Sequence, residues 1–92
     1  MNKKRDRLQI IHDILWAIRE KNGRIKPTHV LYKSNLSHQM LDDYMTNLIG
    51  NGFIIVKRSK DGKKTYSLTD KGFQYLNKYK VIVDFVDSFG LG

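Results

Sequence analysis

Five basic side chains lie within eight consecutive residues, in the segment 57–64. Together they outnumber the single acid Asp61 and give the segment a charge of +4, carried by Lys57, Arg58, Lys60, Lys63 and Lys64. This density of cations suits contacts with a phosphate backbone, where each contact releases condensed counterions. The alternative is a merely solvated turn, and the clustering favours the phosphate interpretation.

A second basic cluster lies at the N-terminus, where residues 1–7 carry a charge of +3. Its cations are Lys3, Lys4, Arg5 and Arg7. The two clusters hold +7 of the net charge of +8, with a pI near 9.8, so the charge is gathered rather than spread. Such clustering of positive charge is typical of proteins that bind a polyanionic partner. The N-terminal cluster is either a basic arm that contacts the partner or a disordered tail.

The intervening segment 34–56 has the opposite character, because it contains no Lys or Arg and carries −2 from Asp42 and Asp43. Polar side chains that can read base edges lie within it, namely Ser37, His38, Gln39, Asp43 and Thr46. Gln39 can pair with adenine, and a carboxylate can accept a hydrogen bond from cytosine although phosphates repel it. The hydroxyl of Ser37 is better explained as a helix cap. Lys33, just before this segment, is a further candidate phosphate contact.

Enzyme chemistry finds little support in this sequence. There is no Cys, which excludes disulfides, thiol catalysis and Cys-based zinc sites. The three His residues are dispersed, and the pair His38 and Asp42 offers only two metal ligands. We therefore expect no enzyme, no metal, no cofactor and no small-molecule ligand. No apolar run of about 18 residues is present that could cross a membrane, and no apolar stretch of signal-peptide type follows the basic N-terminus, so we expect a cytoplasmic protein. Peripheral membrane binding through the basic clusters is disfavoured, because no basic amphipathic helix presents a free apolar face beside them.

Ninety-two residues make one small domain that begins with two helices. The first is predicted from the apolar spacing of Leu8, Ile11, Ile14, Leu15 and Ile18, with Asp6 as N-cap and Asn22-Gly23 as its end. Ile25 falls in a short extended piece. Pro27 or Thr28 then opens a short helix that ends near Asn35.

A third helix is predicted after the tight turn 35–37, from His38 to about Asn51. Ser37 is its N-cap, and Gly50-Asn51-Gly52 ends it. At 100° per residue its apolar residues form one broad face that we expect to be buried: Met40, Leu41, Tyr44, Met45, Leu48 and Ile49.

A β-hairpin follows, with strands at Phe53–Val56 and Thr65–Leu68 and a turn at Asp61-Gly62, where both residues tolerate positive φ. A last helix, capped by Thr69, runs to about Ser88. One of its faces carries Phe73, Leu76 and Val83. A second face has heptad spacing and consists of Tyr75, Tyr79, Ile82, Val86 and Phe89. Two stripes need two partners, so this seam favours a homodimer; the alternative is that it completes the domain's own core.

Two helices, a tight turn and a basic hairpin resemble the small archaeal winged-helix regulators. The resemblance rests on segments 32–37, 41–44, 48–54 and 66–72, the last reading Tyr-Ser-Leu-Thr-Asp-Lys-Gly, and it covers roughly residues 8–89. Small winged-helix proteins of archaeal viruses are similar. The resemblance implies DNA binding as a homodimer, and some members dimerise through a C-terminal coiled-coil helix.

The predicted fold is therefore α+β, a winged helix-turn-helix with a three-helix core, a β-hairpin wing and an extra C-terminal helix. Residues 1–7 are assigned to a basic arm, 8–68 to the core with its wing at 53–68, and 69–92 to a dimerisation helix. The expected function is sequence-directed binding of double-stranded DNA by a homodimeric transcription regulator. The alternative is a protein–protein interaction module that uses the acidic outer face of the third helix.

Overall fold

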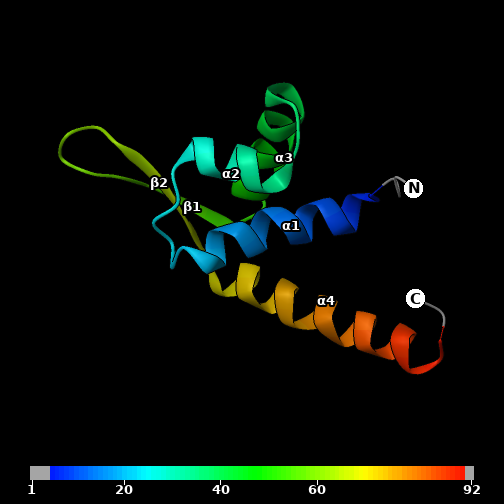
Figure 1. The fold of residues 1–92 in the computed structure, drawn as a ribbon. Helices are drawn as coiled ribbons and strands as arrows, with labels where there is room; N and C mark the ends of the chain where they lie inside the picture. Colours follow the sequence, from blue (N-terminus) through cyan, green and yellow to red (C-terminus); the bar gives the residue numbers. More distant parts are fainter. Residues whose placement is uncertain (1–4, 91–92) are drawn as a thin grey trace.

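The computed structural model describes residues 5–90 (Figure 1). Its elements follow the predicted order of three helices, a two-stranded hairpin and a last helix. Their bounds are α1 Arg7–Glu20, α2 Pro27–Ser34, α3 His38–Gly50, β1 Ile54–Arg58, β2 Lys64–Leu68 and α4 Asp70–Ser88. The expected α+β fold with a hairpin wing and an extra C-terminal helix is confirmed. The structure places Arg7 inside α1, so the helix starts one residue earlier than the expected core boundary.

Helix α1 is capped by Asp6, whose carboxylate accepts a 2.8 Å hydrogen bond from the Gln9 amide, as predicted. Its buried side chains are Ile10, Ile14, Leu15, Ala17 and Ile18. Leu8 was expected in this apolar stripe, but its side chain is 55% exposed. It lies in the first turn of α1, beside the distal half of α4 rather than against the core. The chain turns away at Gly23, which adopts a φ of +74°.

The pair α2 and α3 forms the helix-turn-helix. Lys26 is extended before Pro27, and Asn35 ends α2 in the left-handed conformation. Ser37 caps α3 by accepting a 3.2 Å hydrogen bond from the Met40 amide, which confirms the cap prediction. Leu41, Met45 and Leu48 are buried in the core. The prediction that Met40 and Ile49 are buried is wrong, because they lie at the two edges of that face and no neighbouring element covers them.

The hairpin pairs β1 with β2 in antiparallel register, from Ile54 opposite Leu68 to Arg58 opposite Lys64. Ile25 extends this sheet through a single bridge to Tyr66, as a very short extended piece. The turn spans residues 59–63, which is longer than a two-residue hairpin turn. Gly62 has a φ of +83° but Asp61 does not have a positive φ, so only one of the two predicted residues uses that freedom.

Helix α4 is capped by Thr69, whose hydroxyl accepts a 3.1 Å hydrogen bond from the Gly72 amide. Leu76 is buried against the core, whereas Phe73 and Val83 on the same predicted face are exposed. The proximal half packs beside α1, and the distal half extends away from the body of the domain (Figure 1). No helix within residues 5–90 is long and apolar enough to span a membrane.

Candidate nucleic-acid interface

The basic hairpin, here called the wing (residues 54–68), has an internally bonded tip. The Ser59 amide donates to the Lys63 carbonyl at 2.9 Å, and the Gly62 amide donates to the Ser59 carbonyl at 3.0 Å. The Asp61 carboxylate accepts from the Ser59 hydroxyl and, at 3.2 Å, from the Lys63 amide. These two hydrogen bonds lower the pKa of Asp61, and the bond from the Ser59 hydroxyl has the larger effect. The one acid of the wing is therefore occupied in shaping the turn.

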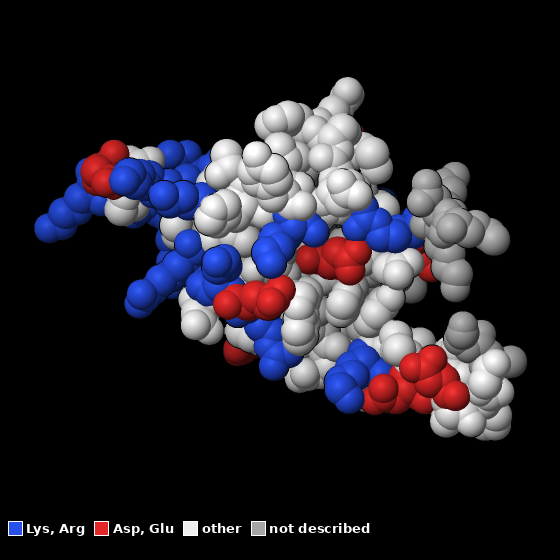
Figure 2. Space-filling model, in the orientation of Figure 1, with Lys and Arg blue, Asp and Glu red and all other residues white. Residues whose placement is uncertain are grey.

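The wing cations point outward from this frame. The side chains of Lys57, Arg58, Lys60 and Lys63 are exposed. Of these four, only Lys63 lies near a carboxylate of residues 5–90, with its ammonium 3.9 Å from Asp61. Lys64 is half-buried, and its ammonium lies 5.7 Å from the centre of the Tyr66 ring. Figure 2 shows Lys and Arg gathered on the hairpin at the left of the view. The structure thus brings the five predicted wing cations onto one projecting arm.

The predicted reading residues lie on the solvent side of α3. Gln39, Asp43 and Thr46 are opposite the buried face of the helix, and Ser37 and His38 are exposed at its N-terminal end. Asp42 and Asp43 are also exposed and form no ion pair with any described residue. The surface over α3, at the top of Figure 2, shows no Lys or Arg. The helix that would read bases therefore presents no Lys or Arg, and its exposed carboxylates are those of Asp42 and Asp43.

The predicted N-terminal arm is described only from Arg5 onward, because Lys3 and Lys4 lie outside the described residues. The Arg5 guanidinium forms a 2.8 Å ion pair with Asp13 and donates to the Asn35 carbonyl at 3.2 Å. It thereby ties the start of the chain to the turn before α3. Lys33, in the last turn of α2, is exposed near that same turn.

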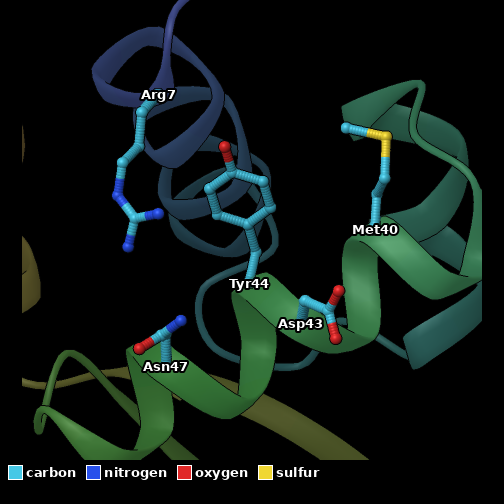
Figure 3. Close-up of a pocket in the computed structure, with 5 residues that line it drawn as sticks. All are labelled: Arg7, Met40, Asp43, Tyr44 and Asn47. Atoms are coloured by element: carbon cyan, nitrogen blue, oxygen red, sulfur yellow. The ribbon is translucent and has the colours of Figure 1, made fainter.

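Arg7, assigned from the sequence to the N-terminal basic cluster, lies beside α3 in the structure, a position that the sequence did not predict. The guanidinium carbon of Arg7 lies 5.6 Å from the centre of the Tyr44 ring, across a hollow that Met40, Asp43 and Asn47 also line (Figure 3). The two residues are far apart in the chain, so no local spacing pattern signals their contact. Only the packing of α1 on the helix-turn-helix brings them together.

The predicted dimer seam divides into two parts. The Tyr75 hydroxyl donates to the Leu8 carbonyl at 2.7 Å, and the Tyr75 ring packs edge-on against Phe53. The Tyr79 ring stacks on His12, with the two ring centres 4.4 Å apart. Burial raises the pKa of Tyr75 to about 12 and also raises the pKa of Tyr79. These two residues thus make contacts within the domain, and their place in a dimer interface stays a prediction.

The distal part of the seam lacks such cover. Ile82 and Phe89 are 59% and 64% exposed, and Val86 is half-buried. Phe85, which the heptad pattern did not include, is 62% exposed and packs on Phe89 with ring centres 5.0 Å apart. Within residues 5–90 no group of three or more His, Asp or Glu side chains could hold a metal ion.

The profile of the winged helix-turn-helix family matches residues 4–86 of this chain. An uncharacterized protein of Methanocaldococcus jannaschii is 38% identical over 79 residues, which cover 86% of this chain. The match covers 34% of that relative, so the chain spans about a third of its length.

Solved structures of other proteins share the fold, among them the following two. A DNA-binding protein of Sulfolobus solfataricus, Sso10a-2, superposes with a TM-score of 0.76 at 21% identity, over 92% of this chain and 85% of its own. The transcriptional repressor CouR, bound to a 23-mer DNA duplex, superposes with a TM-score of 0.69 at 20% identity, over 88% of this chain and 56% of its own.

Proposed function

This chain belongs to the winged helix-turn-helix family, and on that premise we propose that it is a sequence-directed double-stranded DNA-binding protein that regulates transcription as a homodimer. The observation that carries the proposal is the wing. It carries five cations on its turn and the adjoining strand ends, and its single acid is already bonded within the turn. Such an arm suits phosphates beside the major groove or in the minor groove. The shared fold with a DNA-binding protein and a DNA-bound repressor supports the same function.

Helix α3 supplies the reading surface in this proposal. Its N-terminal end carries exposed Ser37, His38 and Gln39, and its outer face adds Asp43 and Thr46. An α-helix fits the major groove, where Gln pairs with adenine and a carboxylate accepts from the cytosine amino group. Because the helix lacks cations, its contacts would discriminate between sequences more than they add general affinity.

A homodimer through the distal half of α4 completes the proposal. Exposed Ile82, Phe85 and Phe89 lie on the half of the helix that extends beyond the domain. Apolar side chains of this size favour burial against a second copy. The substitution Ile82→Glu should give a folded monomer, measured by sedimentation equilibrium, while wild type sediments as a dimer. A monomeric wild type at micromolar concentration would contradict this part.

The test of DNA binding is fluorescence anisotropy of a labelled random-sequence duplex, titrated at several salt concentrations. We expect micromolar-range affinity whose logarithm falls linearly with the logarithm of salt, by about 0.9 for each phosphate contacted. Absence of binding at low salt would overturn the proposal.

One observation favours a second candidate function. Asp42 and Asp43 are exposed on α3 without an ion-pair partner among the described residues, which suits a basic protein partner. In that case the wing would serve solubility. Two results together would support this protein-interaction module instead. The chain would bind no DNA at low salt, and it would form a stable protein complex that the double substitution Asp42→Asn, Asp43→Asn abolishes.

A further inference from the structure

The hollow between the start of α1 and the flank of α3 carries a positive charge that the proposed reading surface does not use. Its lining residues are Arg7, Met40, Asp43, Tyr44 and Asn47 (Figure 3). Arg7 comes from the first turn of α1, and the other four come from α3. The hollow is therefore a composite of two elements that only the fold brings together.

Arg7 is held in place without being neutralised. Its guanidinium lies over the Tyr44 ring, a cation–π arrangement. None of the ion pairs found among residues 5–90 includes Arg7, whereas Arg5, two residues earlier, is paired with Asp13. The planar fork of Arg7 thus keeps its N–H donors for a ligand.

The polar groups that line the hollow lie on two sides of the Tyr44 ring. Figure 3 shows the Arg7 guanidinium and the Asn47 amide on one side of the Tyr44 ring, with the Asp43 carboxylate on the other. The side with Arg7 and Asn47 offers guanidinium and amide donors together. Donors of this kind suit an anionic oxygen, and a guanidinium fork matches a phosphate in particular.

The position of the hollow on α3 decides which part of a duplex would meet it. Gln39, Asp43 and Thr46 point outward, opposite the buried face, whereas Tyr44 and Met40 lie on the flank toward α1. A helix in the major groove turns its outermost residues to base edges, and its flanks lie beside the sugar–phosphate walls. Segment 34–56 has no Lys or Arg, so a cation for that wall has to come from another element.

We infer that Arg7 binds a backbone phosphate of the duplex at this hollow, on the flank of the reading helix. The inference rests on the proposed function and adds to it a contact fixed by the domain core. Arg7 acts from within α1, at a set distance from the reading residues. It thereby anchors α3 in register on the DNA, a task that the cation-free helix cannot perform alone.

The experiment compares Arg7→Gln with a matched control, Arg19→Gln. Arg19 is also an α1 arginine over an aromatic ring, 5.2 Å from the centre of Trp16, but it lies at the other end of the helix. Anisotropy of a labelled random duplex is recorded over a salt series for wild type and both variants. A thermal melt of each variant confirms the fold.

We expect Arg7→Gln to reduce the steepness of the log-affinity against log-salt plot by about 0.9, the value for one phosphate contact. Affinity at low salt should fall by about tenfold. Arg19→Gln should match wild type in both respects. Arg7→Lys, which keeps the charge, should restore the salt dependence.

Two results would overturn the inference while leaving the proposed function intact. One is an Arg7→Gln variant whose salt dependence equals that of wild type and Arg19→Gln. The other is a variant that loses preference for a selected site over random DNA with unchanged salt dependence, which would assign Arg7 to a base. Failure of wild type itself to bind any duplex would instead overturn the proposed function, and the inference with it.

Discussion

The wing and helix α3 lie side by side in sequence and both would face the duplex, yet they are built from opposite charges. The wing carries five cations and one acid that is bonded inside its own turn. Helix α3 carries no cation and two exposed carboxylates, Asp42 and Asp43. In the proposed function the wing would therefore supply affinity for any phosphate backbone, whereas α3 would add contacts that depend on which base it meets.

The structural support of the two regions differs as well. Helix α3 is anchored by Leu41, Met45 and Leu48 in the core. The strands of the wing are also anchored in the core, through Ile54, Tyr66 and Leu68, but its turn at residues 59–63 projects beyond the core. The exposed face of α3 thus lies directly over its core anchors, whereas the tip of the wing lies beyond those of its strands.

The largest expected effect comes from removing the wing charge. Replacing Lys57, Arg58, Lys60, Lys63 and Lys64 with Ala should weaken binding to random and specific duplexes alike, by about a hundredfold or more at moderate salt. The slope of log affinity against log salt should become shallower by up to about 4.5, because each of the five lost contacts removes about 0.9. Lys78→Ala with Lys80→Ala on α4 is the control and should change little. Unchanged DNA affinity of the wing variant would contradict the claim that the wing supplies the sequence-independent affinity.

A smaller effect is expected at the base of the wing. A Cβ at Gly72 would lie 2.6 Å from the Phe53 carbonyl oxygen, so Gly72→Ala must displace α4 or the strand entry. We expect a loss of about 1–3 kcal/mol in the free energy of unfolding, measured by urea denaturation. Gly50→Ala, at the end of α3, meets nothing within 4 Å and should be neutral or stabilising by up to about 1 kcal/mol. Equal free energies of unfolding for the two variants would show that the close approach of Gly72 to the Phe53 carbonyl does not limit the side chain at this position.

The smallest expected effect is one of selectivity. Gln39→Ala should reduce the preference for a selected site over random DNA by about tenfold, if that site places an adenine opposite the helix. Its salt dependence should stay that of wild type, because no charge is removed. Gln74→Ala, an exposed glutamine on α4, is the matched control. A change in salt dependence with unaltered preference would assign Gln39 to the backbone.

Local signals predicted much of this fold correctly. Asp6, Ser37 and Thr69 each cap the predicted helix by accepting a backbone N–H, and these caps depend only on neighbouring residues. Burial at the edges of helical faces was harder to predict. Leu8 and Met40 follow the apolar period but are exposed, because cover at an edge depends on which element packs there.

The candidate site was predictable in the same uneven way. The wing cluster is contiguous in the chain, so composition alone located it. The division of the α4 seam was not predictable, since Tyr75 and Tyr79 find their partners Leu8 and His12 in the distant helix α1. The contact of Arg7 with Tyr44 is likewise tertiary. The roles of the individual base-reading and phosphate-contacting residues stay predictions.

The most direct test of the division between wing and helix is an amide NMR titration of the labelled protein with a short duplex. With random DNA, we predict shifts centred on residues 57–64 that grow weaker as salt is added. With a selected site, we predict additional shifts at residues 37–46 that persist at higher salt. Shifts confined to α4, or an α3 response that is the same on both duplexes, would contradict the account.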